Sequence, residues 1–271
     1  MASGERDWVS RGTDPGRANL ARVYDYWLGG SHNVPADRDA ARAISDVEPA
    51  MPTIARANRA FLGRALRFLA AARIGQFLDI GSGIPTERNV HEVAQQADPA
   101  ARVVYVDADP VAVADGRAML AGNPGAAIIE ADLRDPDKIL ADAEVHRLID
   151  FGRPAGLLLT GVLHFLADAD DPWRIVAALR DALAPGSYLV IGHATTAGRP
   201  AAAAETETAR HPSIAPSLHM RSRAPIFRFF EGFNLVDPGQ VFVPLWRPDS
   251  PAGIPDDPTP FKTLVGVARK P

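Results

Sequence analysis

The spacing of apolar and polar positions divides the chain into two parts. Up to about residue 74, apolar residues recur every three or four positions, as they do in amphipathic helices. Beyond that point, short runs rich in Val, Ile and Leu alternate with helical patterns, and each run is apolar at successive positions. The pattern predicts a helical extension at 18–74 and an α/β domain at 75–271. The polar, glycine-bearing residues 1–17 are expected to form a disordered tail.

The helical extension contains three predicted helices. The first covers residues 20–28 and ends at Gly29 and Gly30, because glycine readily takes the left-handed conformation that closes a helix. The second follows Pro35, and a third, longer helix is predicted at 53–71. All three precede the first predicted strand.

The α/β domain contains seven predicted strands. They cover residues 76–80, 102–107, 126–132, 155–161, 187–195, 241–246 and 263–270. The segments between the first five are long enough for crossover helices, so these strands are expected to be parallel. A Pro-rich loop without a helix joins the last two strands, which follow a helix predicted near 221–231. An antiparallel pair at one edge of a doubly wound sheet is therefore expected.

Composition narrows the class of protein. The 271 residues carry a net charge of −4 and contain no block of Lys and Arg, which disfavours nucleic acid as an obligate partner. The absence of cysteine excludes disulfides, thiolate zinc sites and a cysteine nucleophile. The first ten residues do not form a signal peptide, and no run approaches the ~20 apolar residues of a membrane helix. We expect a cytoplasmic protein without a membrane partner.

The strongest chemical signal is the stretch LDIGSGIPT at 78–86. A strand ends there, and Gly81, Ser82 and Gly83 form a loop that turns tightly and lets a ligand approach the backbone. A helix is predicted to begin at about Thr86, with its unpaired N–H groups facing the ligand. The alternative is a plain turn between a strand and a helix.

A carboxylate at the end of the second strand strengthens this interpretation. Asp107 lies 24 positions beyond Gly83, close to the ~20 at which an acidic residue meets ribose hydroxyls in this architecture. Asp107 and the neighbouring Ala108 are therefore predicted to contact the nucleoside. Alternatively, Asp107 caps the helix after Pro110, although Asp109 is better placed for that role.

The loop favours a nucleoside without phosphate groups. A dinucleotide site would have a third glycine where this chain has Thr86, and Asp79 would repel a pyrophosphate but suit an ammonium group. S-adenosylmethionine combines a ribose, an adenine and an α-amino group. Asp132, at the end of the third strand, would then accept from the adenine amino group, with Leu133 against the ring. A helix N-cap is an equally good interpretation of Asp132.

The run DIGSG, followed by Asp107 and Asp132 at successive strand ends, resembles the class I S-adenosylmethionine-dependent methyltransferases. More narrowly, the chain resembles an actinobacterial methyltransferase family that was formerly a domain of unknown function. The matching stretches are ARVYDYWLGGSHNVPADRDAA, NRAFLGRALRFLA, QFLDIGSGIPTERNVHEVAQ, RVVYVDADPVAVA, GVLHFL, LAPGSYLVIGHAT and RPDSPAGIP. The resemblance covers residues 18–269 and implies a seven-stranded, Rossmann-like mixed sheet with its last strand antiparallel. It also implies cofactor contacts at Thr160 and Gly161, after the fourth strand.

The resemblance also suggests a role for the first helix. In such folds, a segment preceding the sheet often lies across the ligand as a lid. Under this hypothesis Tyr24, Gly30 and Asn33 bring polar groups to the methionine end of the ligand, and Arg59 contacts its carboxylate. The alternatives are a core position for Tyr24, a helix stop at the glycine, and a solvated Arg59.

Catalytic residues are harder to predict, because methyl transfer mainly requires the reactants to be held in line. His164, His193 and Tyr24 are weak candidates for a base, and a local hydrogen bond is the favoured interpretation of both histidines. No acidic or histidine cluster indicates a metal site.

The leading function is methyl transfer to an unidentified small molecule, and a homodimer remains an open option. Two alternatives are a noncatalytic or regulatory protein that binds S-adenosylmethionine, and an NAD-dependent oxidoreductase. The missing third glycine and Asp79 disfavour the oxidoreductase.

Overall fold

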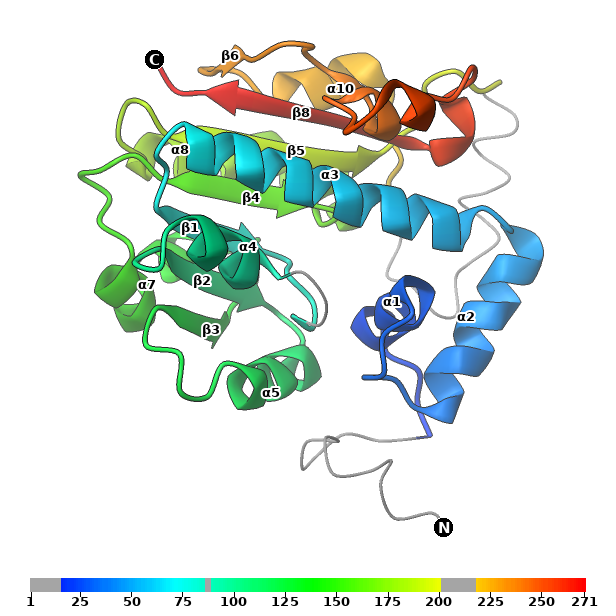
Figure 1. Ribbon diagram of the computed structural model, residues 1–271, viewed down its shortest axis with the longest axis horizontal. Helices are drawn as coiled ribbons and strands as arrows, with labels where there is room; N and C mark the ends of the chain where they lie inside the picture. The colour runs from blue at the N-terminus through cyan, green and yellow to red at the C-terminus, as the bar shows by residue number, and fades with distance from the viewer. Residues whose placement is uncertain (1–15, 86–88, 201–217) are drawn as a thin grey trace.

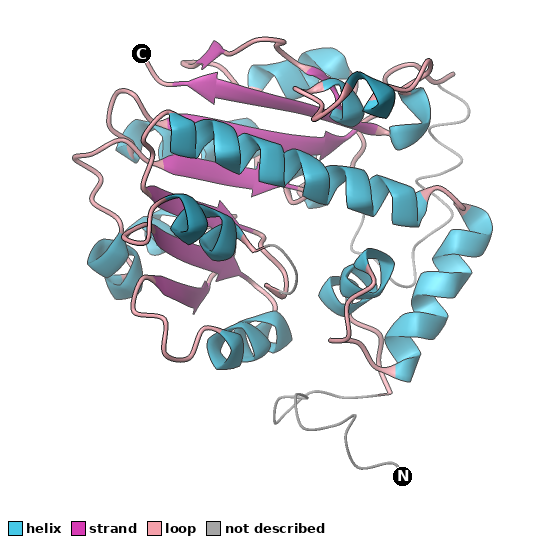
Figure 2. Cartoon of the chain, viewed as in Figure 1, coloured by secondary structure: helices cyan, strands magenta, loops and turns pink. Residues whose placement is uncertain are grey.

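The computed structural model describes residues 16–85, 89–200 and 218–271, which form a central sheet between helices (Figures 1 and 2). Almost all of the predicted tail at 1–17 lies outside the described residues, as does Thr86. Within the described residues, no helix has the length and apolar character needed to cross a membrane.

The sheet has the predicted mixed topology. Its strands are β1 (Gln76–Ile80), β2 (Arg102–Asp107), β3 (Ala126–Glu130), β4 (Gly156–Thr160), β5 (Tyr188–Ala194), β6 (Asn234–Leu235), β7 (Val241–Phe242) and β8 (Thr263–Arg269). A continuous path of seven strands runs β3-β2-β1-β4-β5-β8-β6. Strands β1 to β5 pair in parallel, and β8 is antiparallel to β5. The predicted fold class is therefore confirmed.

The predicted strand at 241–246 is wrong beyond residue 242. Within this segment only residues 241–242, which form β7, pair with β8, and a 3-10 helix follows at Val243–Leu245. Pro244 has no N–H to donate to a strand neighbour, and the turn allows Val243 and Trp246 to be fully buried. The antiparallel pairing of β7 with β8 is nevertheless confirmed, and β7 adds a short eighth strand beside the seven-strand path.

Helices cover both faces of the sheet (Figure 1). The described helices are α1 (Leu20–Leu28), α2 (Pro35–Val47), α3 (Met51–Ala71), α4 (Val90–Ala97), α5 (Pro110–Met119), α6 (Pro136–Leu140), α7 (Ala143–Leu148), α8 (Pro172–Ala182) and α10 (Arg223–Arg228). Side chains of α3, α4 and α5 belong to the apolar core of one face, and those of α6, α7, α8 and α10 to the core of the other. Burial of strands on both faces explains their continuous apolar runs.

Helices α1 and α2 pack with the start of α3 around a separate apolar cluster, and they lie beside the carboxyl ends of the parallel strands (Figure 1). The first helix ends as predicted, because Gly29 is left-handed with φ of 86°. The second begins at Pro35 as predicted, and the third begins at Met51, two residues before the predicted start.

Candidate functional site

The loop after β1 requires glycine for reasons of geometry. Gly81 and Gly83 have φ of 72° and 63°, a conformation that side chains rarely adopt. A Cβ at position 81 would also overlap the Val162 side chain. The N–H groups of Gly81 and Ser82 donate to the Val106 carbonyl, which holds the loop over the end of β2. The loop therefore places its backbone at the carboxyl ends of β1 and β2.

Asp107 fastens this loop to β2. One carboxylate oxygen accepts from the Gly83 N–H at 2.7 Å, and the other accepts from the Asp109 N–H at 2.9 Å. Burial raises the pKa of Asp107, and these backbone donors oppose that rise. Asp109 caps α5 by accepting from the Val111 N–H at 2.8 Å, so the capping role considered for Asp107 belongs to Asp109. Ribose binding by Asp107 stays a prediction.

Asp79 and Arg59 are two opposite charges left open at the same edge. Asp79 is 5% exposed, and no described residue donates a hydrogen bond to its carboxylate. Burial raises its pKa to about 7, the positive charge of Arg59 lowers it, and the negative charge of Asp107 raises it. The Nε of Arg59 is buried and has no hydrogen-bond partner among the described residues. The two groups attract each other electrostatically, but neither has a hydrogen-bond partner among the described residues, and a ligand that supplies such bonds would reduce the cost of burying them.

Asp132 and Leu133 follow β3. Asp132 accepts from the Arg134 N–H at 2.8 Å and pairs with the Arg134 guanidinium at 3.1 Å. Asp135 accepts from the Lys138 N–H and caps α6, so the N-cap interpretation of Asp132 is wrong. The Asp132 side chain remains 46% exposed, whereas Leu133 is 5% exposed and belongs to the core. Adenine contacts by both residues stay predictions.

The remaining predicted residues of the domain lie at the same edge. Thr160 ends β4, and Gly161 follows it with φ of 86°. The Gly161 N–H donates to the Gly192 carbonyl at 2.9 Å, and Ala108 is exposed next to Asp107. The strand topology thus gathers the loop, the acids and these small residues along the carboxyl ends of β1 to β4.

The polar groups of the predicted lid hydrogen-bond within the extension. The Asn33 amide donates to the Asp25 carboxylate at 2.9 Å and to the Gly30 carbonyl at 2.8 Å. A side chain at position 30 would overlap the Asp25 carboxylate. The Tyr24 hydroxyl donates to the Ala55 carbonyl at 3.1 Å. These contacts give Gly30, Asn33 and Tyr24 structural roles, and their ligand contacts stay predictions.

Helix α1 nevertheless reaches the predicted cofactor loop. A Cβ built on Gly83 would lie 3.6 Å from the Cβ of Ala21, so the helix passes directly over the loop. Asn19, the N-cap of α1, donates to the carboxylate of Asp109 beyond β2. Burial raises the pKa of Tyr24 while the charge of Arg59 lowers it, which places Tyr24 and Asp79 under the influence of the same guanidinium. The extension and the strand ends are therefore in contact beside the glycine loop.

The two histidines make local hydrogen bonds. His193 is fully buried, its Nδ1 lies 2.6 Å from the Ala194 carbonyl, and its Nε2 accepts from Arg221 at 2.9 Å. His164 Nδ1 accepts from the Ala194 N–H at 3.4 Å. Burial lowers the pKa of His164 to about 4 and that of His193 well below its usual range, with the Arg221 charge contributing to both. Both rings are therefore neutral and weakly basic at pH 7.

Sequence reasoning missed Asn19 and Arg221. Asn19 immediately precedes the first apolar helical position, which is an N-cap signal that could have found it. Arg221 is 5% exposed and bonds to Asp168, to His193 and to the carbonyls of Leu163 and Leu166. No sequence pattern indicates that network, because its members come from separate segments.

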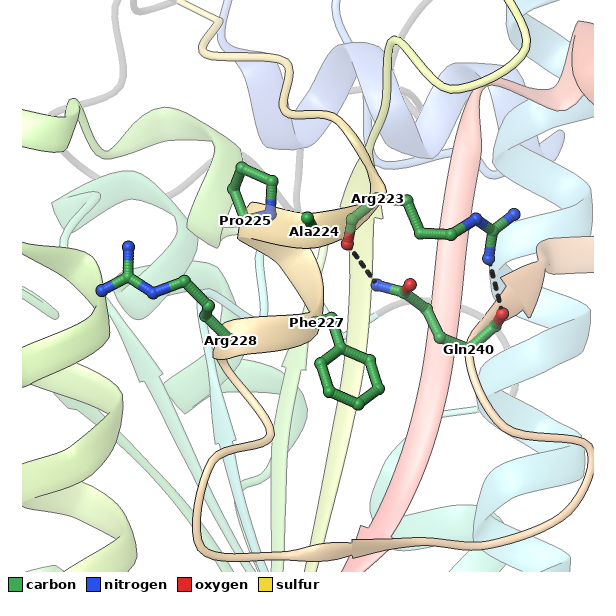
Figure 3. A pocket seen from close by; sticks show the side chains of 6 residues that line it. All are labelled: Arg223, Ala224, Pro225, Phe227, Arg228 and Gln240. Carbon is green, nitrogen blue, oxygen red and sulfur yellow. Dashed lines mark hydrogen bonds between the residues drawn. The ribbon is translucent and has the colours of Figure 1, made fainter.

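Two surface hollows of about 590 Å³ each lie elsewhere. The first is an open surface on α10, where Arg223 and Gln240 exchange two hydrogen bonds beside the exposed Phe227 (Figure 3). The second lies at the amino ends of the strands. Neither hollow is lined by a predicted site residue. Among the described residues, no three or more His, Asp or Glu side chains gather to hold a metal ion.

The fold, the glycine loop and the acids at successive strand ends define a class I S-adenosylmethionine-dependent methyltransferase. The sequence profile of the S-adenosyl methyltransferase family matches residues 6–271, and the chain belongs to that family. S-adenosylmethionine is its cofactor, which confirms the cofactor prediction over the NAD alternative.

Two crystal structures are similar over nearly the whole chain. A candidate methyltransferase from Thermobifida fusca YX is 44% identical, with a TM-score of 0.89, and the match covers 97% of this chain and 99% of that one. A DUF574 family protein from Streptomyces avermitilis MA-4680 is 40% identical, with a TM-score of 0.86 and coverage of 95% and 99%. Both source organisms agree with the predicted actinobacterial family.

A more distant likeness shows the fold alone. The riboflavin-derivative dimethyltransferase RosA from Streptomyces davawensis is 20% identical, with a TM-score of 0.51 over 92% of this chain and 62% of that one. No curated protein matches the chain.

Proposed function

We propose that the protein binds the amino-acid end of S-adenosylmethionine between Arg59 and Asp79 and transfers the methyl group to a small molecule. The observation that carries this proposal is the pair of open, opposite charges at the carboxyl end of β1. A zwitterionic amino acid offers one carboxylate and one ammonium group, which match a guanidinium and a carboxylate that form no hydrogen bond with the described residues.

The residues present fit this cofactor. The Asp107 carboxylate stands at the end of β2 and holds the glycine loop, which suits a ligand with ribose hydroxyls and no phosphate. Asp132, at the next strand end, remains half-exposed and open to a hydrogen-bond donor such as an amino group. The cofactor supplies an electrophilic methyl on sulfur, and the chain supplies its orientation.

The proposed contribution of the protein to rate is alignment and exclusion of water. Helix α1 passes over Gly83, so the extension covers the loop and restricts the space beside it. Restricted space favours a small acceptor over a macromolecule. His164 and His193 are poor bases, because the pKa of each is lowered by burial. The proposed acceptor therefore has a nucleophile that reacts without losing a proton to either histidine.

The decisive experiment compares two ligands that differ in the amino-acid end. S-adenosylhomocysteine has it, and 5′-methylthioadenosine lacks it. Calorimetry should show that Arg59→Gln lowers the affinity for S-adenosylhomocysteine by about 10- to 100-fold, as expected for the loss of one charge-assisted hydrogen bond. The affinity for methylthioadenosine should stay unchanged. The matched control is Arg56→Gln, because Arg56 is exposed on the same helix and bonds only to Thr53 among the described residues.

An equal loss of affinity for both ligands would contradict the proposed contact between Arg59 and the carboxylate of the cofactor. Turnover is tested separately, with a labelled methyl group and a panel of small amines, phenols and carboxylic acids. Methylation of proteins or nucleic acid, with none in the small-molecule panel, would contradict the proposed acceptor class.

A further inference from the structure

The hollow at the amino ends of the strands is remote from the cofactor site. Its lining includes the first residues of β1, β2 and β5 and the last residue of the antiparallel β8. The predicted cofactor residues follow the carboxyl ends of the same strands, so the two sites lie at opposite edges of the sheet. The volume of about 590 Å³ is within the range of small-molecule sites. We call it the amino-edge hollow.

Four arginines line the amino-edge hollow: Arg73, Arg102, Arg153 and Arg269. All four are exposed, and no described residue forms an ion pair or hydrogen bond with any of their guanidinium groups. The lining contains one acid, Asp98, so it has a surplus of three positive charges in a chain whose net charge is −4. This local excess attracts anions against the charge of the whole chain.

The walls of the hollow are held by hydrogen bonds. The side-chain amide of Gln76 donates to the backbone carbonyls of Asp150 and Arg153 at 2.8 and 3.0 Å, and the oxygen of the same amide accepts from the Asp150 N–H. These bonds fix the loop that precedes β4. The guanidinium of Arg269 lies 3.6 Å from the position that a Cβ on Gly186 would occupy, so this arginine lies over the glycine turn before β5.

The floor contains a polar group that the fold does not use. Tyr188 lines the hollow and is 8% exposed, and its hydroxyl has no hydrogen-bond partner among the described residues. Its ring packs edge-on against Phe68 at 5.8 Å, which fixes its orientation. The hydroxyl itself is solvent-accessible in the hollow, where it can donate a hydrogen bond to an anion.

We propose that the amino-edge hollow binds a small molecule with a polyphosphate group, at a site independent of the cofactor. Guanidinium groups match phosphate oxygens in geometry and charge, and they bind them with paired hydrogen bonds. The arginines come from four separate segments, so an ion with a single phosphate reaches fewer of them than a chain of two or three phosphates does. The free polyphosphate and a nucleoside triphosphate share this chemistry.

Calorimetry on the full chain at low ionic strength tests the proposal with two probes, inorganic tripolyphosphate and ATP. Low salt is needed because exposed charges are screened within about 10 Å at 0.1 M. We expect one molar equivalent to bind, with an affinity that saturating S-adenosylhomocysteine leaves unchanged. The double variant Arg102→Gln/Arg269→Gln should lower the affinity for tripolyphosphate at least about tenfold, which corresponds to the loss of one charged hydrogen bond.

The matched control is Arg117→Gln on α5, which removes one exposed arginine away from the hollow and should leave the affinity unchanged. The affinity of the double variant for S-adenosylhomocysteine shows that it is folded. Tighter binding of ATP would identify a nucleotide as the source of the polyphosphate, and equal or tighter binding of tripolyphosphate would identify the free ion. Absence of heat with both probes, equal weakening in the control, or displacement of the probe by S-adenosylhomocysteine would overturn the proposal.

Discussion

The helical extension and the α/β domain are stabilised in different ways. The domain buries apolar strands between two layers of helices and has a large apolar core on each face of the sheet. The extension has a smaller apolar cluster and adds a buried ion pair, in which Arg22 Nε lies 2.7 Å from the Asp37 carboxylate. Asp25 and Asn33 form a second buried polar contact. An apolar core tolerates the substitution of one apolar side chain by another of similar size, whereas removing either partner of a buried ion pair leaves an unpaired buried charge.

This difference means that single substitutions should loosen the extension without unfolding the sheet. The predicted cofactor site uses residues from both parts. The affinity for the cofactor should therefore change when the extension is loosened, whereas the free energy of unfolding of the sheet should not. The following substitutions separate the two contributions.

The largest effect is expected from Arg22→Leu. The change leaves the Asp37 carboxylate, which is 0% exposed, without its countercharge, and it should cost the extension about 3–5 kcal/mol. Limited proteolysis should then cut within residues 18–50, and the affinity for S-adenosylhomocysteine should fall. The control is Arg42→Leu, which breaks an exposed pair with Asp39 and a contact with Tyr26 and should have a much smaller effect on stability. Equal protease resistance of both variants would contradict the importance of the buried pair.

Asp79→Asn should change stability and binding in opposite directions. Because the folded-state pKa of about 7 exceeds the ordinary value of 3.8, the folded protein favours protonated Asp79, and ionisation destabilises it progressively as the pH rises from 3.8 to 7. Removing the charge should therefore stabilise the ligand-free protein by up to roughly 4 kcal/mol above pH 7, and by less at pH 5.5.

Urea unfolding at pH 5.5 and 8.5 measures this gain, and calorimetry should show weaker S-adenosylhomocysteine binding by the same variant. In the wild type, binding should weaken as the pH falls below 7, because a protonated Asp79 no longer attracts an ammonium group. A variant that is no more stable than the wild type at pH 8.5 would show that another group already compensates the carboxylate.

The variants Asp107→Ala and Asp132→Ala test two different acids: Asp107 holds the glycine loop by a hydrogen bond, and Asp132 does not. Loss of Asp107 removes the partner of the Gly83 and Asp109 N–H groups as well as the proposed ribose contact, so S-adenosylhomocysteine affinity should fall by about 100-fold. Loss of the half-exposed Asp132 should cost about tenfold or less. Similar losses in a calorimetric titration would argue against a special role for Asp107.

The smallest effect is expected at the end of α1. Gly30→Ala should destabilise the extension by about 2 kcal/mol, because the new methyl overlaps the Asp25 carboxylate. Gly29→Ala meets open space and should cost only the ~1 kcal/mol of a left-handed alanine. Hydrogen exchange of the α1 amides measures both changes, and a larger effect at Gly29 would contradict the packing around Asp25.

The sequence predicted the parts of the fold that depend on local patterns. Runs of apolar residues located β1 to β5 within two residues at each end, and Gly29 located the end of α1. The glycine loop, Asp107 and Asp132 could be placed at one edge because the carboxyl ends of parallel strands always meet there.

Features that arise from contacts between distant segments could not be predicted. The strand expected at 241–246 ends early because Trp246 reaches the core and packs against Phe61, nearly 200 positions away. The open charges of Arg59 and Asp79 depend on how α3 crosses the sheet, which no spacing reveals. The start of α4 is different, since Asn89 and Glu92 form a local capping signal that the prediction of a start near Thr86 overlooked.

The contact between Asn19 and Asp109 joins two helix caps. Each residue satisfies the first N–H groups of its own helix, α1 or α5, and the two side chains also bind each other. A direct side-chain hydrogen bond thus connects α1 to the turn that follows Asp107. A ligand that shifts this turn would also strain the hydrogen bond to Asn19, so we expect ligand binding and the position of α1 to be coupled.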